Sequence, residues 1–150
     1  MKHPLAVGAA SLAILFSLGL AACGSSDNSS DDALPKSELI AQADEICKSG
    51  NEALDQEISD TFGNETPSKD EVVTFLDQEI LPAIRSELEK LRELQPEEAD
   101  ADAWNNVLDT LETEIQAVED DPESAYTQKE LFPESSAAAQ DFGLTVCGSS

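Results

Sequence analysis

The sequence predicts an all-α protein: a small up-down bundle of about four helices with one long-range disulfide, preceded by a signal peptide and a flexible tether. Three observations support this prediction. From residue 37 onward, apolar residues recur at spacings of three and four, which is the period of one face of an α-helix. Prolines, glycines and capping residues divide that pattern into four segments. Strand signals are nearly absent, and only residues 144–146 have the composition of an extended segment.

The first predicted helix begins at residue 37 and ends where Gly63 and Asn64 interrupt the apolar pattern. Its apolar face includes Cys47 and Gly50. Cys47 therefore lies on the side of the helix that a disulfide in the core would need.

The second predicted helix has the clearest start in the chain. Ser68 and Glu71 match a capping box, in which each side chain accepts a hydrogen bond from the backbone N–H of the other residue. The apolar stripe continues to Leu94, and Pro96 closes the helix. Pro82 lies inside this pattern. Because proline removes a backbone hydrogen bond and clashes with the preceding turn, we expect a kink near residues 78–82.

The third predicted helix opens at residues 97–98, and its apolar stripe runs from Trp104 to Val118. Trp104 is the best single candidate for a ligand contact, since tryptophan is often the anchor of a binding site. Its place at the start of a regular stripe favours the other interpretation, packing in the core.

The fourth predicted helix begins with Asp121 as its cap and Pro122 in the first helical position. It is interrupted at Pro133 and resumes as far as Phe142. Gly143 then lies where a left-handed residue commonly ends a helix.

The N-terminus predicts a signal peptide over residues 1–22. Lys2 gives a weakly basic start, and residues 4–20 form an uncharged apolar run. That run is close to the length of about 20 residues that spans a bilayer. After Cys23, however, the chain is rich in Gly, Ser, Asn and Asp and offers no basic stop signal, which favours a cleaved signal over a membrane span.

The segment Leu20-Ala21-Ala22-Cys23 resembles a bacterial lipobox. The resemblance implies attachment of a diacylglycerol to Cys23 and cleavage before it. It also implies a location on the extracytoplasmic face of the cell membrane, with the lipid on Cys23 as the anchor. An ordinary secretory signal followed by an accidental cysteine is the alternative.

Three parts follow from these boundaries: a lipoprotein signal peptide (1–22), the lipidated cysteine with a flexible acidic tether (23–36) and a helical bundle domain (37–148). A coil of this composition reaches about 20 Å. The folded domain is therefore expected close to the membrane.

The chain is strongly acidic. From Cys23 onward, seven basic residues stand against all 32 acidic residues, so the processed chain has a formal charge of −25. This charge argues against a nucleic-acid partner. It is explained either by solubility in a salty or alkaline setting or by a surface that binds a basic partner or cations. Because the acidic residues are spread along every helix, we favour the first explanation.

Two cysteines remain when Cys23 is assigned to the lipid. In an exported protein, Cys47 and Cys147 suggest one disulfide across 100 residues, and two free buried thiols are the alternative. The single histidine, His3, lies in the predicted signal peptide. The processed chain therefore lacks the residues for Ser-His-Asp or Cys-His catalysis and for any metal site that contains histidine.

Asp27, Ser29, Asp31 and Glu38 occupy positions 1, 3, 5 and 12 of a possible calcium loop. Position 6 is Asp32, where the sharp turn of such a loop needs glycine, and no helix is predicted before it. A solvated acidic linker is the simpler interpretation.

Other acidic groups could hold a divalent cation at a helix junction, although helix capping explains them with fewer assumptions. They are Asp100 with Asp102, and Glu119, Asp120, Asp121 and Glu123. A pair of carboxylates could also hydrolyse glycosides without histidine, but 32 acidic residues produce accidental pairs. We expect no enzyme, no catalytic residue, no cofactor and no metal.

Three stretches are similar to a group of uncharacterised small actinobacterial secreted lipoproteins. They are residues 38–47 (ELIAQADEIC), the Leu-x-x-Leu-x-x-Leu-x-Pro pattern of residues 88–96, and residues 142–148 (FGLTVCG). The resemblance implies an envelope location and a paired cysteine, and it carries no activity, substrate or catalytic residue.

The leading hypothesis is a structural or protein-interaction module of the cell envelope, with a possible envelope protein as partner. The alternative is a small-molecule or cation-binding lipoprotein that is accessory to transport. A cavity between the helices lined by polar groups would favour the alternative, and a filled core with an exposed apolar patch would favour the interaction module.

Overall fold

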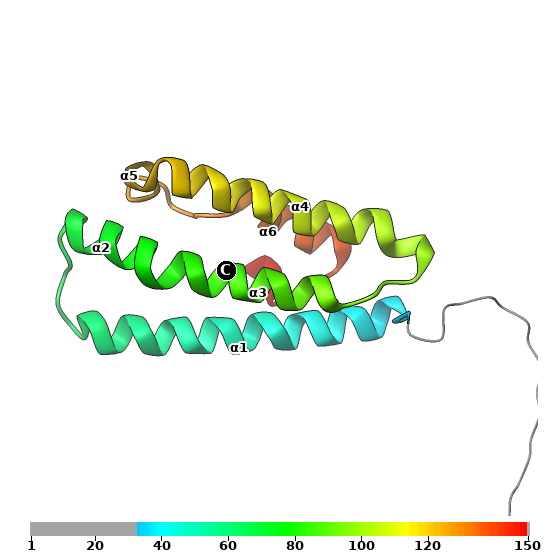
Figure 1. Cartoon of the computed structure of the whole chain (residues 1–150). Coiled ribbons are helices and arrows are strands. Elements are labelled where there is room, and N and C mark those ends of the chain that lie inside the picture. Colours follow the sequence, from blue (N-terminus) through cyan, green and yellow to red (C-terminus); the bar gives the residue numbers. More distant parts are fainter. Residues whose placement is uncertain (1–32, 150) are drawn as a thin grey trace, which may run out of the picture.

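The computed structural model describes residues 33–149 (Figure 1). The predicted signal peptide, the predicted lipidation site Cys23 and the possible calcium-loop positions Asp27, Ser29 and Asp31 lie outside these residues.

The described chain is helical throughout, with short connections, which confirms the predicted all-α class. No strand is present among residues 33–149, and Leu34 and Pro96 form only an isolated bridge. The elements in chain order are α1 (Lys36–Phe62), α2 (Lys69–Phe75), the π-helical turn η1 (Leu76–Ile80), α3 (Leu81–Glu93), α4 (Glu98–Asp120), α5 (Pro122–Ala125), α6 (Pro133–Phe142) and the 3₁₀ turn η2 (Cys147–Ser149).

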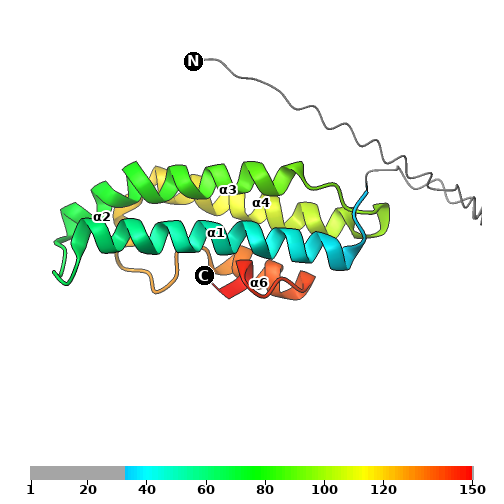
Figure 2. The same cartoon turned by 90° about the horizontal axis from the view of Figure 1, so that it is seen from below.

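Three long rods run alternately up and down: α1, the rod made of α2, η1 and α3, and α4 (Figure 1). The shorter α6 packs against α4, and η2 packs against both α6 and α1. Figure 2 shows α6 and the C-terminal segment together on one side of the bundle. The predicted up-down bundle is therefore confirmed, with α6 as its fourth helix.

Local start and stop signals are found where the sequence predicts them. The side chain of Ser68 accepts a hydrogen bond from the backbone N–H of Glu71, and the carboxylate of Glu71 accepts one from the backbone N–H of Ser68. Gly143 ends α6 with a φ of 112°, a left-handed conformation that favours glycine.

Pro82 changes the helix at the predicted place, and the change takes the form of a π-helical turn. The N–H of Leu81 donates to the carbonyl of Leu76, five residues back, instead of to the residue four back. Pro82 has no N–H, so one carbonyl of the preceding turn loses its usual donor. The wider turn of residues 76–80 lets the rod continue through the proline.

The fourth predicted helix is wrong between residues 126 and 132. α5 is a four-residue helix, and a loop separates it from α6. The physical reason is Pro133, because a residue before proline is pushed out of the helical region. Phe132 accordingly has φ −132° and ψ 58°, and Pro133 occupies the start of α6. Residues 144–146, which have a strand-like composition, are irregular in the structure.

The core is formed by the apolar faces of the three rods, closed on one side by α6. Trp104 is 1% exposed, so its predicted packing in the core is confirmed. Its ring lies 5.5 Å from that of Phe142 at the end of α6, measured between centroids. The other most deeply buried side chains are Leu39, Ile115, Leu144 and Cys47.

Candidate functional site

A disulfide joins Cys47, in the middle of α1, to Cys147 in η2. The two Cα atoms are 5.2 Å apart, and the bond closes a separation of 100 residues. The predicted pairing is confirmed, and the alternative of two free thiols is wrong. The disulfide holds residues 143–149 against α1, and we call this segment the C-terminal strap.

Asp44 fastens the same strap one turn before Cys47. Its carboxylate accepts hydrogen bonds from the backbone N–H groups of Thr145 (3.1 Å), Val146 (2.9 Å) and Cys147 (3.3 Å), and from the hydroxyl of Thr145 (2.8 Å). Burial by itself would raise the pKa of Asp44, but the bonds from Val146, Thr145 and Cys147 together hold it below its usual value. These hydrogen bonds stabilise the ionised form of the Asp44 carboxylate and hold it against the strap.

A cavity lies beside the strap, between α1, α3, α4 and α6. Its volume is ≈ 50 Å³. Most of its wall is apolar, and the disulfide forms part of it. The lining residues are Cys47, Asn51, Ile84, Glu87, Leu91, Trp104, Val107, Leu111, Phe132, Ser135, Ser136, Ala139, Leu144 and Cys147.

Trp104, one of the lining residues, has an unpaired donor. The Nε1 atom of its indole ring is buried and has no hydrogen-bond partner within residues 33–149. Leaving a buried N–H unpaired costs about 1–3 kcal/mol, so nearly all such groups in proteins find a partner. The single tryptophan of the chain therefore fills a core position with one donor left unpaired.

Glu87 lines the same cavity and has a carboxyl group with a raised pKa. Burial raises its pKa from 4.5 to about 7, and attraction to Lys90 on the same helix lowers it only in part. No hydrogen bond or ion pair to this carboxyl group is found in the described part of the chain. A carboxyl group with this pKa exchanges its proton near neutral pH.

Gly50 makes room for the Glu87 side chain where α3 crosses α1. A Cβ atom at position 50 would lie 1.9 Å from Oε2 of Glu87, so any other residue there would displace the carboxyl group. Glu87 also lines a groove of ≈ 300 Å³ on the outer side of the α1–α3 contact, together with Gly50, Glu57, Glu79 and other residues. Its carboxyl group thus stands between this outer groove and the inner cavity.

Ser135, another polar residue of the cavity wall, has structural partners. The N–H groups of Glu134 and Ser135, at the start of α6, donate to the two carboxylate oxygens of Glu114 on α4 (2.9 and 2.8 Å). The hydroxyl of Ser135 donates to the carbonyl of Phe132 (3.2 Å). Glu114 thereby fixes the N-terminus of α6 against α4.

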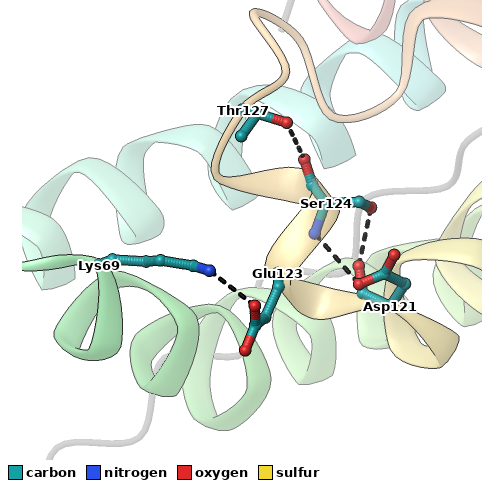
Figure 3. A network of polar contacts seen from close by, with 5 residues as sticks. All are labelled: Lys69, Asp121, Glu123, Ser124 and Thr127. Atoms are coloured by element: carbon teal, nitrogen blue, oxygen red, sulfur yellow. Dashed lines mark hydrogen bonds and ion pairs between the residues drawn. The ribbon is translucent and has the colours of Figure 1, made fainter.

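Four of the six acidic residues weighed as cation ligands form ion pairs or a cap instead. Glu123 pairs with Lys69 (2.6 Å) and joins α5 to α2, while Asp121 accepts a hydrogen bond from the N–H of Ser124 (3.2 Å) (Figure 3). Glu119 binds Arg85 through two hydrogen bonds of 2.6 and 2.5 Å, and Asp100 lies 3.4 Å from Lys36. Within residues 33–149, no group of three or more His, Cys, Asp or Glu residues is placed to hold a metal ion.

Glu87 and Gly50 are the site residues that sequence reasoning missed as a pair. Glu87 follows Ile84 by three positions and precedes Leu91 by four, so it occupies a position on the apolar face of its helix. Gly50 lies on the apolar face of the first helix in the same way. A glutamate within one apolar stripe and a glycine within another are the sequence features that could have indicated this pair.

One donor and one carboxyl group can hold a small polar molecule in a largely apolar wall. Glu87 is the one acidic residue that lines it, whereas glycoside hydrolysis needs two carboxyl groups that face each other.

Few large hydrophobic residues are exposed on the described part of the chain. The exposed large hydrophobic residues in the described chain are Ile58, 41% exposed, and Tyr126, 49% exposed. Among these residues, no helix combines the length and the apolar character that crossing a membrane requires.

This geometry defines the chain as a disulfide-strapped helical bundle with a small, partly polar interior cavity. Comparisons with protein-family models, with curated proteins and with solved structures each find no match to the chain.

Proposed function

We propose that this protein is a lipid-anchored protein of the cell envelope that binds a small molecule in the cavity between α1, α3, α4 and α6. The single observation that carries the proposal is one cavity lined both by Trp104, whose buried Nε1 has no hydrogen-bond partner, and by Glu87, whose carboxyl group makes no hydrogen bond or ion pair within the described chain. A bound molecule would supply the hydrogen bonds that the protein leaves unmade.

The proposed location at the membrane rests on the sequence. Residues 1–22 read as a signal peptide, and Cys23 is the proposed lipidation site. Anchoring at Cys23 would keep the bundle near the membrane, where a binding protein can serve transport as an accessory. The interaction-module hypothesis has less support, because Ile58 and Tyr126 are the exposed large hydrophobic residues of the described bundle.

Mass spectrometry of the membrane fraction tests the proposed lipid anchor at Cys23. We expect a mature chain that begins at Cys23 and carries the added mass of a diacylglycerol. An unmodified Cys23 in a soluble mature protein would contradict the anchor.

Nuclear magnetic resonance tests the binding. The chain has one tryptophan, so a sample labelled with ¹⁵N-tryptophan gives a single indole N–H signal, that of Trp104. The processed chain in detergent micelles is titrated with a set of polar molecules of up to about five non-hydrogen atoms, a size set by the cavity. We expect at least one member to shift the indole signal along a saturating curve.

Two substitutions on α6 provide the matched control. Ala139 lines the cavity and Ala137 is exposed on the same helix. Ala139→Leu fills the cavity and should abolish the shift, whereas Ala137→Leu should keep it. If no molecule in the set produces a saturable shift in the unsubstituted chain, the cavity is not a binding site.

A further inference from the structure

The walls of the cavity also restrict the kind of molecule that fits. Trp104 Nε1 is a donor without an acceptor, so the ligand must bring an oxygen or another acceptor to that side. The carboxyl group of Glu87 makes no hydrogen bond or ion pair within the described chain, so it can accept from a donor of the ligand, and a cation is the strongest such donor. The rest of the wall is largely apolar and suits a short carbon chain.

The size of the space limits that chain. A water molecule needs about 10–15 Å³ of a cavity measured in this way. The cavity of ≈ 50 Å³ therefore has room for a molecule of about four non-hydrogen atoms.

The charge of the protein favours a cationic ligand over an anionic one. The processed chain has a formal charge of −25, which concentrates cations at its surface and repels anions. Glu57 and Glu79 line the outer groove beside Glu87, with Lys90 as the one basic residue of that groove. A small cation that crosses the groove over Gly50 meets Glu87 before it reaches the cavity.

We propose that the cavity binds a small primary amine that carries a neighbouring oxygen, with a two-carbon amino alcohol as the simplest member of the class. The ammonium group of the ligand donates to the carboxylate of Glu87, and its oxygen accepts from Nε1 of Trp104. Gly50 provides the access, because its missing side chain leaves space for the Glu87 carboxyl group to lie there and to move aside. This inference rests on the proposed binding function and names its ligand class.

Three probes of four non-hydrogen atoms separate the contributions. Ethanolamine has both recognition groups, propylamine lacks the oxygen and ethylene glycol lacks the amine. Each is titrated at pH 7.5 into the processed chain in detergent micelles, and the indole signal of Trp104 is followed. A ligand of this size reaches a Kd of about 4 × 10⁻⁵ M at best, so the titrations extend to about 10⁻¹ M.

We expect ethanolamine to saturate the shift at a concentration at least about tenfold lower than either analogue, as expected for a charge-assisted hydrogen bond. Glu87→Gln, which keeps the size of the side chain, should weaken ethanolamine about tenfold and leave ethylene glycol unchanged. Glu89→Gln is the control, because Glu89 is exposed on the same helix and lines neither the cavity nor the groove.

The outcomes that overturn the ligand class differ from those that overturn the function. Equal binding of ethanolamine and ethylene glycol, or an unchanged ethanolamine affinity in Glu87→Gln, would refute the amine class and leave small-molecule binding intact. The same holds if all three probes fail while another molecule of the broader set saturates the indole shift. Failure of every molecule would refute both proposals and leave water as the content of the cavity.

Discussion

The carboxyl groups of Asp44 and Glu87 lie on either side of the Cys47–Cys147 disulfide, and their surroundings shift their pKa values in opposite directions. Asp44 accepts hydrogen bonds from three backbone N–H groups and a hydroxyl of the strap, which keep its pKa below the usual value. Glu87 has no such bonds, and burial raises its pKa to about 7. Asp44 is therefore fully used in holding the fold, whereas the ionised form of Glu87 costs the fold stability.

The disulfide is the first way to test this comparison, because it anchors the strap that Asp44 binds. The double substitution Cys47→Ala and Cys147→Ser should lower the free energy of unfolding by about 2–5 kcal/mol, as removal of a crosslink over a long loop increases the entropy of the unfolded chain. Urea denaturation followed by circular dichroism measures the change. Chemical reduction of the unsubstituted protein should reproduce it, and an unchanged midpoint would mean that the strap holds without the bond.

Asp44→Ala should have the next largest effect. The substitution leaves the N–H groups of Thr145, Val146 and Cys147 without their acceptor, at a cost of about 2–3 kcal/mol. Hydrogen exchange at the amide of Val146 should become faster than in the unsubstituted protein, and urea denaturation gives the total loss. A loss below about 0.5 kcal/mol would show that the disulfide alone fastens the strap.

Glu87→Gln should act in the opposite direction. The folded-state pKa of about 7 lies above the ordinary value of 4.5, so the folded chain binds more protons than the unfolded chain between these pH values. The stability due to this group is therefore full below pH 4.5 and is lost as the pH rises through 7. We expect Glu87→Gln to be more stable than the unsubstituted chain by about 1–2 kcal/mol at pH 8.5, and by much less at pH 5.

The pH dependence distinguishes Glu87 from its neighbours. Lys90 on the same helix and Glu57 and Glu79 in the outer groove surround its exposed side, and Asn51 faces it from α1 without charge. Glu89→Gln, an exposed substitution on the same helix, should leave the difference between pH 5 and pH 8.5 unchanged. If Glu87→Gln has the same stability difference between these pH values as the unsubstituted chain, Glu87 is not the group responsible.

Asp44 should give a pH dependence of the reverse sign. Because its folded-state pKa is lowered, its contribution is present above the ordinary value of 3.8 and is lost as the pH falls below that value. Acid denaturation curves of the unsubstituted chain and of Asp44→Ala should therefore converge as the pH falls below 3.8. Curves that stay parallel at low pH would contradict this assignment.

Gly50→Ala should have the smallest effect on stability. Alanine favours a helix over glycine by about 1 kcal/mol, but its Cβ atom would occupy the place of Oε2 of Glu87. The displaced carboxyl group moves toward solvent, so we expect a net change within about 1 kcal/mol and a pKa of Glu87 closer to 4.5. Chemical shifts of the glutamate carboxyl carbons measure this pKa. A pKa that stays at about 7 would mean that Gly50 does not set the position of Glu87.

Sequence reasoning predicted those features of the fold that short patterns determine. Ser68 with Glu71 and the left-handed Gly143 depend only on residues next to them, and Cys47 and Cys147 were the two cysteines left to pair. The position of the Pro82 distortion was also predicted, whereas its π-helical form was not, because it depends on which carbonyl the N–H of Leu81 reaches.

The cavity could not be predicted, because its residues are brought together by tertiary packing. Trp104 was identified as a candidate, yet whether its Nε1 atom finds a partner depends on how α6 covers α4. Glu87 looked like one acidic residue among 32, and its burial follows from the passage of α3 over Gly50. The apolar pattern of one helix does not predict which residue of another helix, here Gly50, will pack against it.

The carboxyl-carbon titration of the unsubstituted chain tests the central claim most directly. One ¹³C experiment follows Asp44 and Glu87 together, with Asp44→Asn and Glu87→Gln to assign the two signals. We predict that Glu87 titrates with a midpoint of about 7 and Asp44 with a midpoint below 3.8. A Glu87 midpoint at the ordinary value of 4.5 would show that its carboxyl group is already solvated, and would contradict its role as the unpaired group that receives a ligand.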